Sequence, residues 1–129
     1  MTLRWGVTFD TGALIALERR KARMLALLGA AAAQRREVTV PTAVIAEWWR
    51  GRSNARERIL RSDPFTIEPL SSELAKLAGE AMAATPGATI VDAIVMASAA
   101  SRSDIVYTSD FDDLDALSAF FPAVRVLAV

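Results

Sequence analysis

At 129 residues, with 53 % apolar and 23 % charged side chains, the chain has the length and composition of one globular domain, which excludes a disordered chain or two full-sized cores. It contains neither cysteine nor histidine, which rules out disulfides, thiolate or histidine metal sites, and cysteine or histidine catalysis. The net charge is zero, but residues 1–65 hold 12 Lys and Arg against 6 Asp and Glu, and residues 66–129 hold 3 against 9, so a polyanionic ligand is not excluded.

The pattern of apolar residues predicts short strands that alternate with helices. In chain order, the first half contains a strand at Trp5–Phe9, two helices between Ala13 and Gln34, a strand at Val38–Val40, and helices at Ala43–Arg50 and Asn54–Leu60. Asp10-Thr11-Gly12 breaks the first strand, Thr42 can cap the third helix and Gly51 can end it.

The second half continues the alternation. It contains a strand at Phe65–Ile67, a helix from Ser71 or Ser72 to about Ala84, an apolar helix from Ile90 to about Ala100, a strand at Ile105–Tyr107, a helix at Asp110–Phe120 and a last strand at Val124–Leu127. Strands that are apolar throughout and separated by helices are typical of a parallel sheet covered on both faces. The sequence therefore predicts an α/β fold built as one domain over residues 1–129, without linkers or repeats.

Two features of the sequence bear on where the protein works. No segment reaches the roughly 20 apolar residues that cross a bilayer. The N-terminal segment Met1–Trp5 lacks the apolar run and the cleavage site of a secretory signal. Because cysteine is absent as well, we expect a cytoplasmic protein that does not bind membranes.

Four acids are predicted to lie beyond the carboxyl ends of the strands, where open parallel sheets gather their functional groups. Asp10 follows the first strand directly, and Asp110 follows the strand that contains Tyr107. Glu47 lies on the helix entered from the second strand, and Asp92 lies near the start of the helix that leads into the Tyr107 strand. Segments distant in sequence thus bring acids to the same edge of the sheet.

Each acid also has a purely structural explanation. The acids that directly follow strands can cap the next helix, and Thr89 with Asp92 fits a capping box. Glu47 can pair with Arg50 one turn along, a weak interaction on a helix surface. Asp92 and Glu47, however, lie among apolar residues, and a buried carboxylate needs a cation or donors nearby.

A divalent cation would neutralise such acids, because the second half of the chain has few basic residues. Sites made only of carboxylates prefer hard ions such as Mg²⁺ or Mn²⁺ over zinc or copper. Mg²⁺ held by a few carboxylates keeps waters and open positions, which can activate an attacking water and bind phosphate oxygens. The acids therefore predict metal-assisted hydrolysis of phosphodiester bonds.

Four segments, in order along the chain, resemble PIN-domain nucleases, and most closely the VapC-type toxins of bacterial toxin–antitoxin pairs. The segments are Val7–Thr11 with the following Ala13–Leu17, Val44–Trp48, Val91–Ala97 and Tyr107–Leu114. Their order and spacing and the total length agree with the family, so the resemblance covers nearly the whole chain. It implies a three-layer α/β/α fold with a short parallel sheet.

The resemblance implies an endoribonuclease that uses Mg²⁺ or Mn²⁺ to cleave RNA and has a small antitoxin protein as its inhibitor and DNA-binding partner; we also expect a homodimer. The acids at the four catalytic and metal-binding positions are Asp10, Glu47, Asp92 and Asp110. A further metal-binding acid follows in many relatives; Asp112 is our choice, and Asp113 fits almost as well. The hydroxyls that usually support the acids correspond to Thr11 and Thr108.

Two further groups are predicted with alternatives left open. Arg50, Arg52 and Arg56 can grip the RNA backbone, although such a stretch is usually a solvated helix face. Trp48 and Trp49 are bulkier than the leucine-like residues usual at this point of the family. They can line the groove that receives the antitoxin, since Trp is enriched at binding hot spots, or they can pack in the core.

Three other functions compete with the nuclease. An aspartyl phosphatase needs a second acid two residues after Asp10, where this chain has Gly12. A receiver-type phosphoacceptor needs a Lys after a late strand, and only Lys21 and Lys76 are present. A catalytically silent module that binds RNA or a partner stays as the alternative, although it would have no need of all four acids.

Overall fold

The computed structural model describes residues 3–129; Met1 and Thr2, which begin the segment predicted to lack a secretory signal, lie outside this range. Its centre is a sheet of five strands: β1 (Val7–Phe9), β2 (Val38–Pro41), β3 (Phe65–Glu68), β4 (Ile105–Thr108) and β5 (Arg125–Ala128). The order across the sheet is β3-β2-β1-β4-β5, and every neighbouring pair is parallel. The prediction of a parallel sheet is confirmed.

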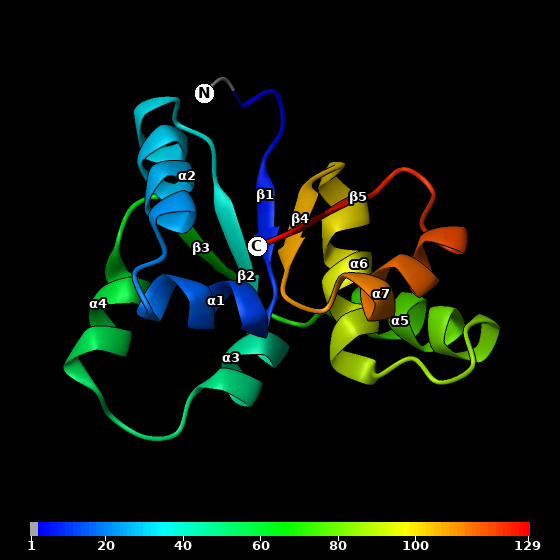
Figure 1. The fold of residues 1–129 in the computed structure, drawn as a ribbon. Helices are drawn as coiled ribbons and strands as arrows, with labels where there is room; N and C mark the ends of the chain where they lie inside the picture. The colour runs from blue at the N-terminus through cyan, green and yellow to red at the C-terminus, as the bar shows by residue number, and fades with distance from the viewer. Residues whose placement is uncertain (1–2) are drawn as a thin grey trace.

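Helices cover the sheet on both sides (Figure 1). On one side lie α1 (Thr11–Glu18), α2 (Ala22–Ala33), α3 (Thr42–Trp48) and α4 (Asn54–Arg61). On the other side lie α5 (Ser72–Ala84), α6 (Ile90–Arg102) and α7 (Phe111–Asp115), which the 3₁₀ turn η1 (Ala116–Ala119) continues. This arrangement confirms the three-layer α/β/α architecture. Within residues 3–129, no helix combines the length and the apolar character needed to cross a membrane.

The three central strands, β1, β2 and β4, are almost wholly buried because helices cover both faces of the sheet, whereas the edge strands β3 and β5 keep exposed residues. Five apolar strand residues have no exposed surface: Val7, Phe9, Val38, Val40 and Val106. The burial of each such side chain contributes about 1.5–3 kcal/mol of hydrophobic stabilisation. Helix α6 is buried without interruption from Ala93 to Ala99 and packs against β1, β2 and β4. It is therefore the central helix of its layer.

Some element ends differ from those predicted. Strand β1 begins at Val7, and Trp5, which was predicted to begin it, is 40 % exposed. Helix α3 begins with Thr42 itself, and the N-cap position predicted for Thr42 is occupied by Pro41. Proline is tolerated at a helix start because it has no N–H to donate. The same helix ends at Trp48, ahead of Gly51. The predicted helix from Asp110 to Phe120 is shorter, because its second half tightens into η1.

Candidate active site

The carboxyl ends of the neighbouring strands β2, β1 and β4 meet at one edge of the sheet. Asp10 follows β1 and Asp110 follows β4, while Glu47 lies in α3, entered from β2, and Asp92 lies in the first turn of α6. The charges of Asp110 and Asp92 act on Asp10, and those of Asp113 of α7, Asp110 and Glu47 act on Asp92, so the five acids lie in one neighbourhood with Asp92 in common. We call the five carboxylates the acidic edge.

A close approach between two turns brings Asp10 and Asp110 together. A Cβ atom at Gly12 would stand 1.8 Å from Ser109 Oγ and 3.0 Å from the Ser109 backbone nitrogen. Only glycine leaves room for this contact, because backbone atoms cannot move aside as the end of a flexible side chain can. In the sequence Gly12 indicated the end of the first strand and argued against a phosphatase, and its packing role is visible only once Ser109 is placed.

Asp10 is buried, with 4 % of its surface exposed, and both of its carboxylate oxygens accept hydrogen bonds. Oδ1 accepts from the backbone N–H of Ala13 at 2.9 Å, which confirms that Asp10 caps α1. Oδ2 accepts from the hydroxyl of Thr108. The Thr108 hydroxyl oxygen in turn accepts from the backbone N–H of Asp110 at 2.8 Å. Thr108 therefore links the side chain of Asp10 to the backbone of Asp110.

The pKa of Asp10 is raised from its ordinary value of 3.8 to about 6. The main cause is burial, which disfavours the charged carboxylate. The hydrogen bonds from Thr108 and Ala13 lower the pKa, and the negative charges of Asp110 and Asp92 raise it. The electrostatics thus place Asp10 within range of two other members of the acidic edge.

Asp92 is half-buried, less than its apolar helix led us to expect, because it lies in the exposed first turn of α6. Its backbone N–H donates to the hydroxyl of Thr89 at 3.3 Å, which is the Thr half of the predicted capping box. Burial raises the pKa of the Asp92 carboxyl, hydrogen bonding to Thr89 opposes the shift, and the charges of Asp113, Asp110 and Glu47 add to it. Asp92 therefore lies near three acids from two other segments.

Two acids of α7, Asp112 and Asp113, are candidates for the further metal-binding acid, and Asp112 is our choice from the sequence. Asp113 is the residue of α7 whose charge raises the pKa of Asp92 most. Consecutive residues of a helix point about 100° apart, so Asp112 and Asp113 extend from α7 in different directions. The burial of Leu114, also in α7, fixes which side of the short helix faces the core.

Glu47 is exposed, which corrects the expectation of an apolar setting. The hydroxyl of Thr11, at the start of α1, donates to Glu47 Oε1. Arg50 does not take up the predicted pairing with Glu47, because its guanidinium donates to the carbonyl oxygens of Ala46 at 3.2 Å and Trp49 at 2.8 Å. Glu47 is thus held from α1 and not from its own helix.

Asp110 occupies the N-cap position of α7, but its side chain makes no capping hydrogen bond. The purely structural explanation of this acid, as a helix cap, is therefore wrong. Its side chain is exposed at the acidic edge, where its charge acts on the pKa values of both Asp10 and Asp92.

The two tryptophans have different environments. Trp48 is only 3 % exposed, and its indole N–H donates to Glu18 of α1. Its burial agrees with the core-packing alternative for this residue rather than with the partner groove. The ring of Trp49 stands edge-on to that of Trp48 at 6.2 Å and keeps part of its surface exposed.

The three arginines predicted to contact RNA also differ. Arg56 donates from Nε to Glu18 at 3.2 Å, and its guanidinium lies 5.2 Å from the centre of the Trp48 ring. Arg50 and Arg52 are exposed, on the segment between α3 and α4. Arg56 is therefore part of an intramolecular cluster, while the other two face solvent beside Glu47.

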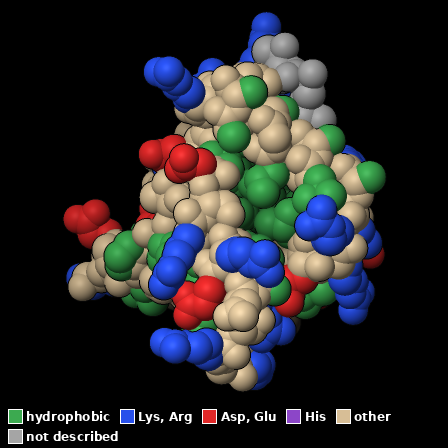
Figure 2. All heavy atoms as spheres, turned by 90° about the vertical axis from the view of Figure 1, so that its left-hand side faces the viewer, with side chains coloured by type: hydrophobic (Ala, Val, Ile, Leu, Met, Phe, Trp, Pro, Cys, Tyr) green, Lys and Arg blue, Asp and Glu red, His purple; other side chains and the backbone are tan. Residues whose placement is uncertain are grey.

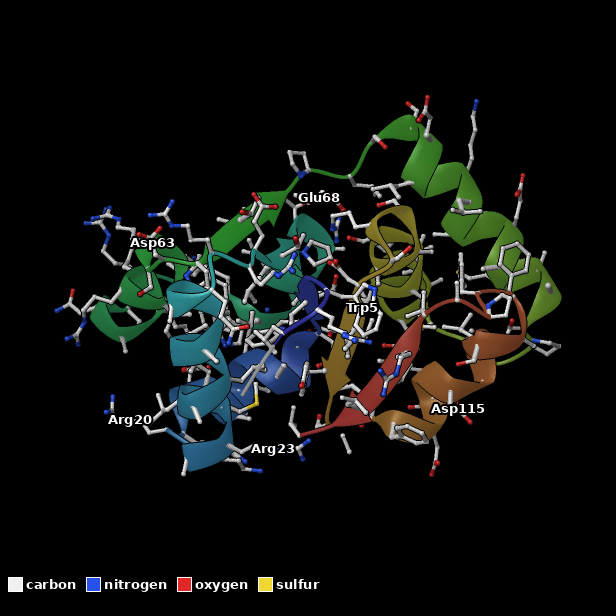
Figure 3. The ribbon with its side chains drawn as sticks, turned by 90° about the horizontal axis from the view of Figure 1, so that it is seen from above. Trp5, Arg20, Arg23, Asp63, Glu68 and Asp115 are labelled. Atoms are coloured by element: carbon white, nitrogen blue, oxygen red, sulfur yellow. The ribbon has the colours of Figure 1, made fainter. Side chains whose placement is uncertain are left out.

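A second charged cluster, which we did not predict from the sequence, ties α6 to the sheet. The guanidinium of Arg102 donates to Asp104 at 3.0 Å, to Glu68 of β3, to Thr8 of β1 at 3.1 Å and to Ser98 at 2.8 Å. In the view from above, Glu68 lies between the strands and α6 (Figure 3). Asp104 is 4 % exposed and also accepts from the Thr8 hydroxyl at 2.8 Å. The only signal in the sequence was that Arg102 is one of three basic residues after position 65.

The donor chemistry of the acidic edge fits a hard divalent cation, since all of its charged groups are carboxylates. In the part of the chain that the structure describes, no group of three metal-ligating side chains stands close enough to hold an ion. Burial is the main cause of the raised pKa values of Asp10 and Asp92, the charges of the neighbouring acids add to it, and a cation between the carboxylates would oppose both effects.

A sequence-family model described as a PIN domain matches residues 7–119 of the chain. The chain is also similar to solved structures. VapBC2 from Rickettsia felis, bound to a DNA fragment from its promoter, shares 10 % identity with it at a TM-score of 0.74, over 95 % of this chain and 98 % of that one. FitAcB from Neisseria gonorrhoeae shares 21 % identity at a TM-score of 0.66, over 94 % and 96 % of the two chains.

A toxin–antitoxin complex from Klebsiella pneumoniae gives a TM-score of 0.66 at 18 % identity, over 92 % of this chain and 95 % of that one. At such identities the structural likeness establishes the fold alone. Comparison with curated proteins finds no significant match. The family model, in contrast, spans nearly the whole described chain and all five members of the acidic edge. The chain belongs to the PIN-domain family.

Proposed function

We propose that this protein is a Mg²⁺- or Mn²⁺-dependent endoribonuclease and acts as the VapC-type toxin of a toxin–antitoxin pair. The observation that carries the proposal is the gathering of five carboxylates at one edge of a parallel sheet, with the most buried of them, Asp10, raised in pKa to about 6. Membership of the PIN-domain family and the likeness to solved toxin–antitoxin complexes support it.

Asp10, Glu47, Asp92 and Asp110 would hold the metal ion, with Asp112 or Asp113 as a further acid; Glu47 lies at the exposed margin of the site. When bound, such an ion supplies an activated water and neutralises charge on the phosphate oxygens. The hydroxyl of Thr108 orients the Asp10 carboxylate from the other side of the site.

The hydroxyl of Thr11 likewise orients Glu47. The exposed guanidinium groups of Arg50 and Arg52 lie on the segment that follows α3, where they would bind the phosphates that flank the scissile one.

The activity is tested directly with purified protein and labelled single-stranded RNA. We expect cleavage in the presence of Mg²⁺ or Mn²⁺ and none after addition of excess EDTA, because carboxylates alone cannot replace the ion as a source of activated water. Product formation on a denaturing gel is the measurement.

Two outcomes of that assay would count against the proposal. Cleavage that persists in excess chelator would show that the acidic edge does not act through a metal. RNA that is bound tightly but never cut, with any divalent ion, would favour the catalytically silent module instead.

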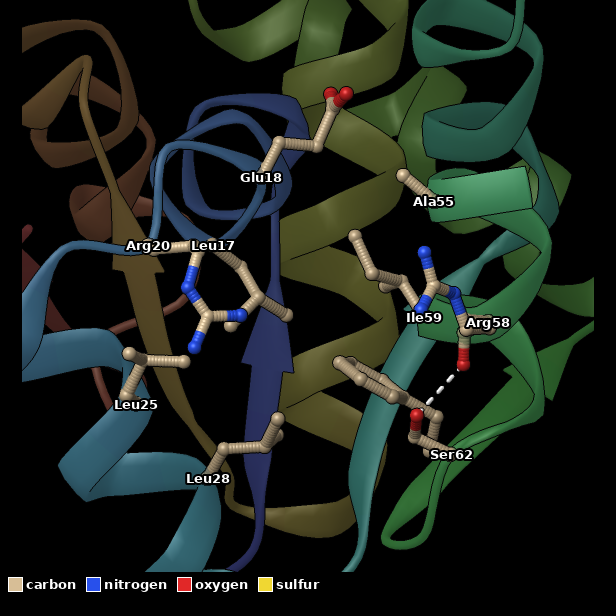
Figure 4. Close-up of a pocket in the computed structure, with 10 residues that line it drawn as sticks. Leu17, Glu18, Arg20, Leu25, Leu28, Ala55, Arg58, Ile59 and Ser62 are labelled. Carbon is tan, nitrogen blue, oxygen red and sulfur yellow. Dashed lines mark hydrogen bonds between the residues drawn. The ribbon is translucent and has the colours of Figure 1, made fainter. Parts of the chain in front are cut away.

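A groove of about 380 Å³ between α1, α2 and α4 offers a surface for the inhibitory partner. Its apolar residues are Leu17, Leu25, Leu28, Ile59 and Phe65. Figure 2 shows hydrophobic side chains at the bottom of a hollow that is surrounded by Lys and Arg side chains. Arg20 and Arg58 lie on opposite sides of the groove in Figure 4.

Helix α4 has no fully buried residue. A partner in the groove would therefore bury apolar surface of α4 that is now exposed to solvent. We infer that the antitoxin places an apolar segment with acidic residues here, because such a segment matches both the floor and the charge of the rim. The end of α1 lines this groove, and the start of the same helix borders the acidic edge. A partner bound in the groove would therefore lie close to the acidic edge.

The partner proposal is tested by co-expression with the small neighbouring gene. We expect a stable complex in which RNA cleavage is suppressed, and we expect Leu28→Asp to release the partner, since it puts a charge into the apolar floor. Size-exclusion chromatography and the cleavage assay are the measurements. A Leu28→Asp protein that folds normally and still forms the complex would place the partner elsewhere.

A further inference from the structure

Glu47 has little of its own to hold it in place. It is exposed, it lies near the end of the seven-residue helix α3, and the chain beyond that helix, from Trp49 to Ser53, forms neither helix nor strand. The hydrogen bond from Thr11 fixes only the end of its side chain. The position of its backbone therefore depends on how α3 is attached to α1.

The attachment is made by the next residue in the chain. Trp48 is buried, and its indole N–H donates to Oε1 of Glu18 at the last residue of α1. The other carboxylate oxygen of Glu18 accepts from Arg56 Nε at 3.2 Å, and the Arg56 guanidinium lies 5.2 Å from the centre of the Trp48 ring. Glu18, Trp48 and Arg56 thus form a closed cluster of three side chains from α1, α3 and α4.

The chemistry of Glu18 suits this role. A Trp side chain has a single donor and no acceptor, and an Arg side chain has only donors, so a carboxylate with two oxygens satisfies both at once. Glu18 and Arg56 are each about one quarter exposed as side chains, so solvent screens their ion pair less than it does a fully exposed one. Figure 4 shows the Glu18 carboxylate extending from α1 toward the α4 side of the groove.

Helix α1 therefore contacts α3 at two points. Thr11, its first residue, binds Glu47, and Glu18, its last, binds Trp48. Residues seven apart in a helix lie two turns apart, about 10 Å along its axis and on nearly the same face. Two hydrogen bonds at that separation restrain the end of α3 that carries Glu47, in addition to the packing of α3 against α6 and its direct connection to β2.

We propose that Glu18 is a positioning residue, which sets the place of Glu47 at the acidic edge through Trp48. This inference concerns the arrangement of the site that the proposed nuclease function uses. It does not require that the site cut RNA.

A nitroxide spin label tests the placement without any metal or substrate. The sequence has no cysteine, so Glu47→Cys gives a single labelling site in the full chain. We expect Glu18→Ala to increase the mobility of the label in the electron paramagnetic resonance spectrum. We expect Glu18→Gln, which keeps an oxygen for the Trp48 N–H, to restore most of the order. The matched control is Glu57→Ala, which removes the exposed ion pair with Arg61 in α4 and should leave the label unchanged.

Mn²⁺ affinity, measured by calorimetry on the unlabelled chain, provides the second readout. We expect Glu18→Ala to weaken Mn²⁺ binding at least about fivefold in the wild-type background and less than about twofold in the Glu47→Gln background, since residues that act through one another are not additive. Equal losses in both backgrounds, or a label at position 47 that Glu18→Ala leaves as ordered as before, would overturn the proposal. If the unlabelled wild-type chain bound no Mn²⁺, the proposed metal-dependent function would be refuted. If the label at position 47 still became more mobile in the Glu18→Ala variant, the positioning role would be supported all the same.

Discussion

The Asp10→Asn variant is expected to be more stable than the wild-type protein without metal and to lose both metal binding and RNA cleavage. The raised pKa of Asp10, about 6 against 3.8, corresponds to about 3 kcal/mol of unfavourable charge burial at neutral pH. Asn keeps an oxygen for the Ala13 N–H that caps α1, and loses at most about 1 kcal/mol of helix-dipole interaction. Its NH₂ group cannot accept from the Thr108 hydroxyl, which costs about 1 kcal/mol more. The net gain is about 1 kcal/mol, or a few degrees in melting temperature.

The pH dependence of this gain follows from the direction of the shift. The pKa of Asp10 in the folded protein lies above its ordinary value, so the metal-free wild type loses stability as the pH rises from about 4 to about 6. The Asp10→Asn variant has no carboxyl group at this position and therefore keeps that stability. Calorimetric melts at pH 7 and pH 4 should therefore show the difference at pH 7 and little of it at pH 4. Mn²⁺ should raise the melting temperature of the wild type only, since Asn cannot supply the anion that the ion needs.

Asp92→Asn should behave in the same direction, because burial and three neighbouring acids raise the pKa of Asp92. Asp115→Asn is the matched control: this exposed acid ends α7 but lies outside the acidic edge, so the change should affect neither property. An Asp10→Asn protein that melts several degrees lower than wild type and still cleaves RNA would mean that Asp10 serves only as a helix cap.

Arg102→Ala is expected to destabilise the fold strongly. It leaves Glu68 and the buried Asp104 without their cation and removes donors to Thr8 and Ser98. Loss of one partner from a buried ion pair costs about 3–5 kcal/mol, because the remaining charge stays in a poorly solvated place. The free energy of unfolding in urea is the measurement.

The exposed ion pair between Arg61 and Glu57 provides the comparison. Arg61 is 82 % exposed as a side chain, so Arg61→Ala should cost less than about 1 kcal/mol. Arg102→Lys should fall between the two, since an ammonium group keeps the charge but cannot reach all the acceptors that the planar guanidinium binds. A loss below about 1 kcal/mol for Arg102→Ala would show that the cluster is not a structural anchor.

Much of the architecture and of the candidate site was predictable from local sequence patterns. Short apolar runs separated by helical ones require a parallel sheet that is covered on both faces, and the structure confirms it. In such a sheet the residues that follow adjacent strands come to the same edge, so the neighbourhood of Asp10 and Asp110 followed from their position in the sequence. The pKa effects extend that neighbourhood to Asp92 and Glu47.

Only the tertiary structure decided which side of each helix faces the site and which long-range contacts hold it. It placed Asp113 beside Asp92, buried Trp48, exposed Glu47 and joined Glu18 to both Trp48 and Arg56. The cluster around Arg102 unites residues up to 96 positions apart, from Thr8 to Asp104. The physical reason is that strand and helix patterns depend on neighbours along the chain, whereas the rotation of a short helix and the partner of a charge depend on packing between elements.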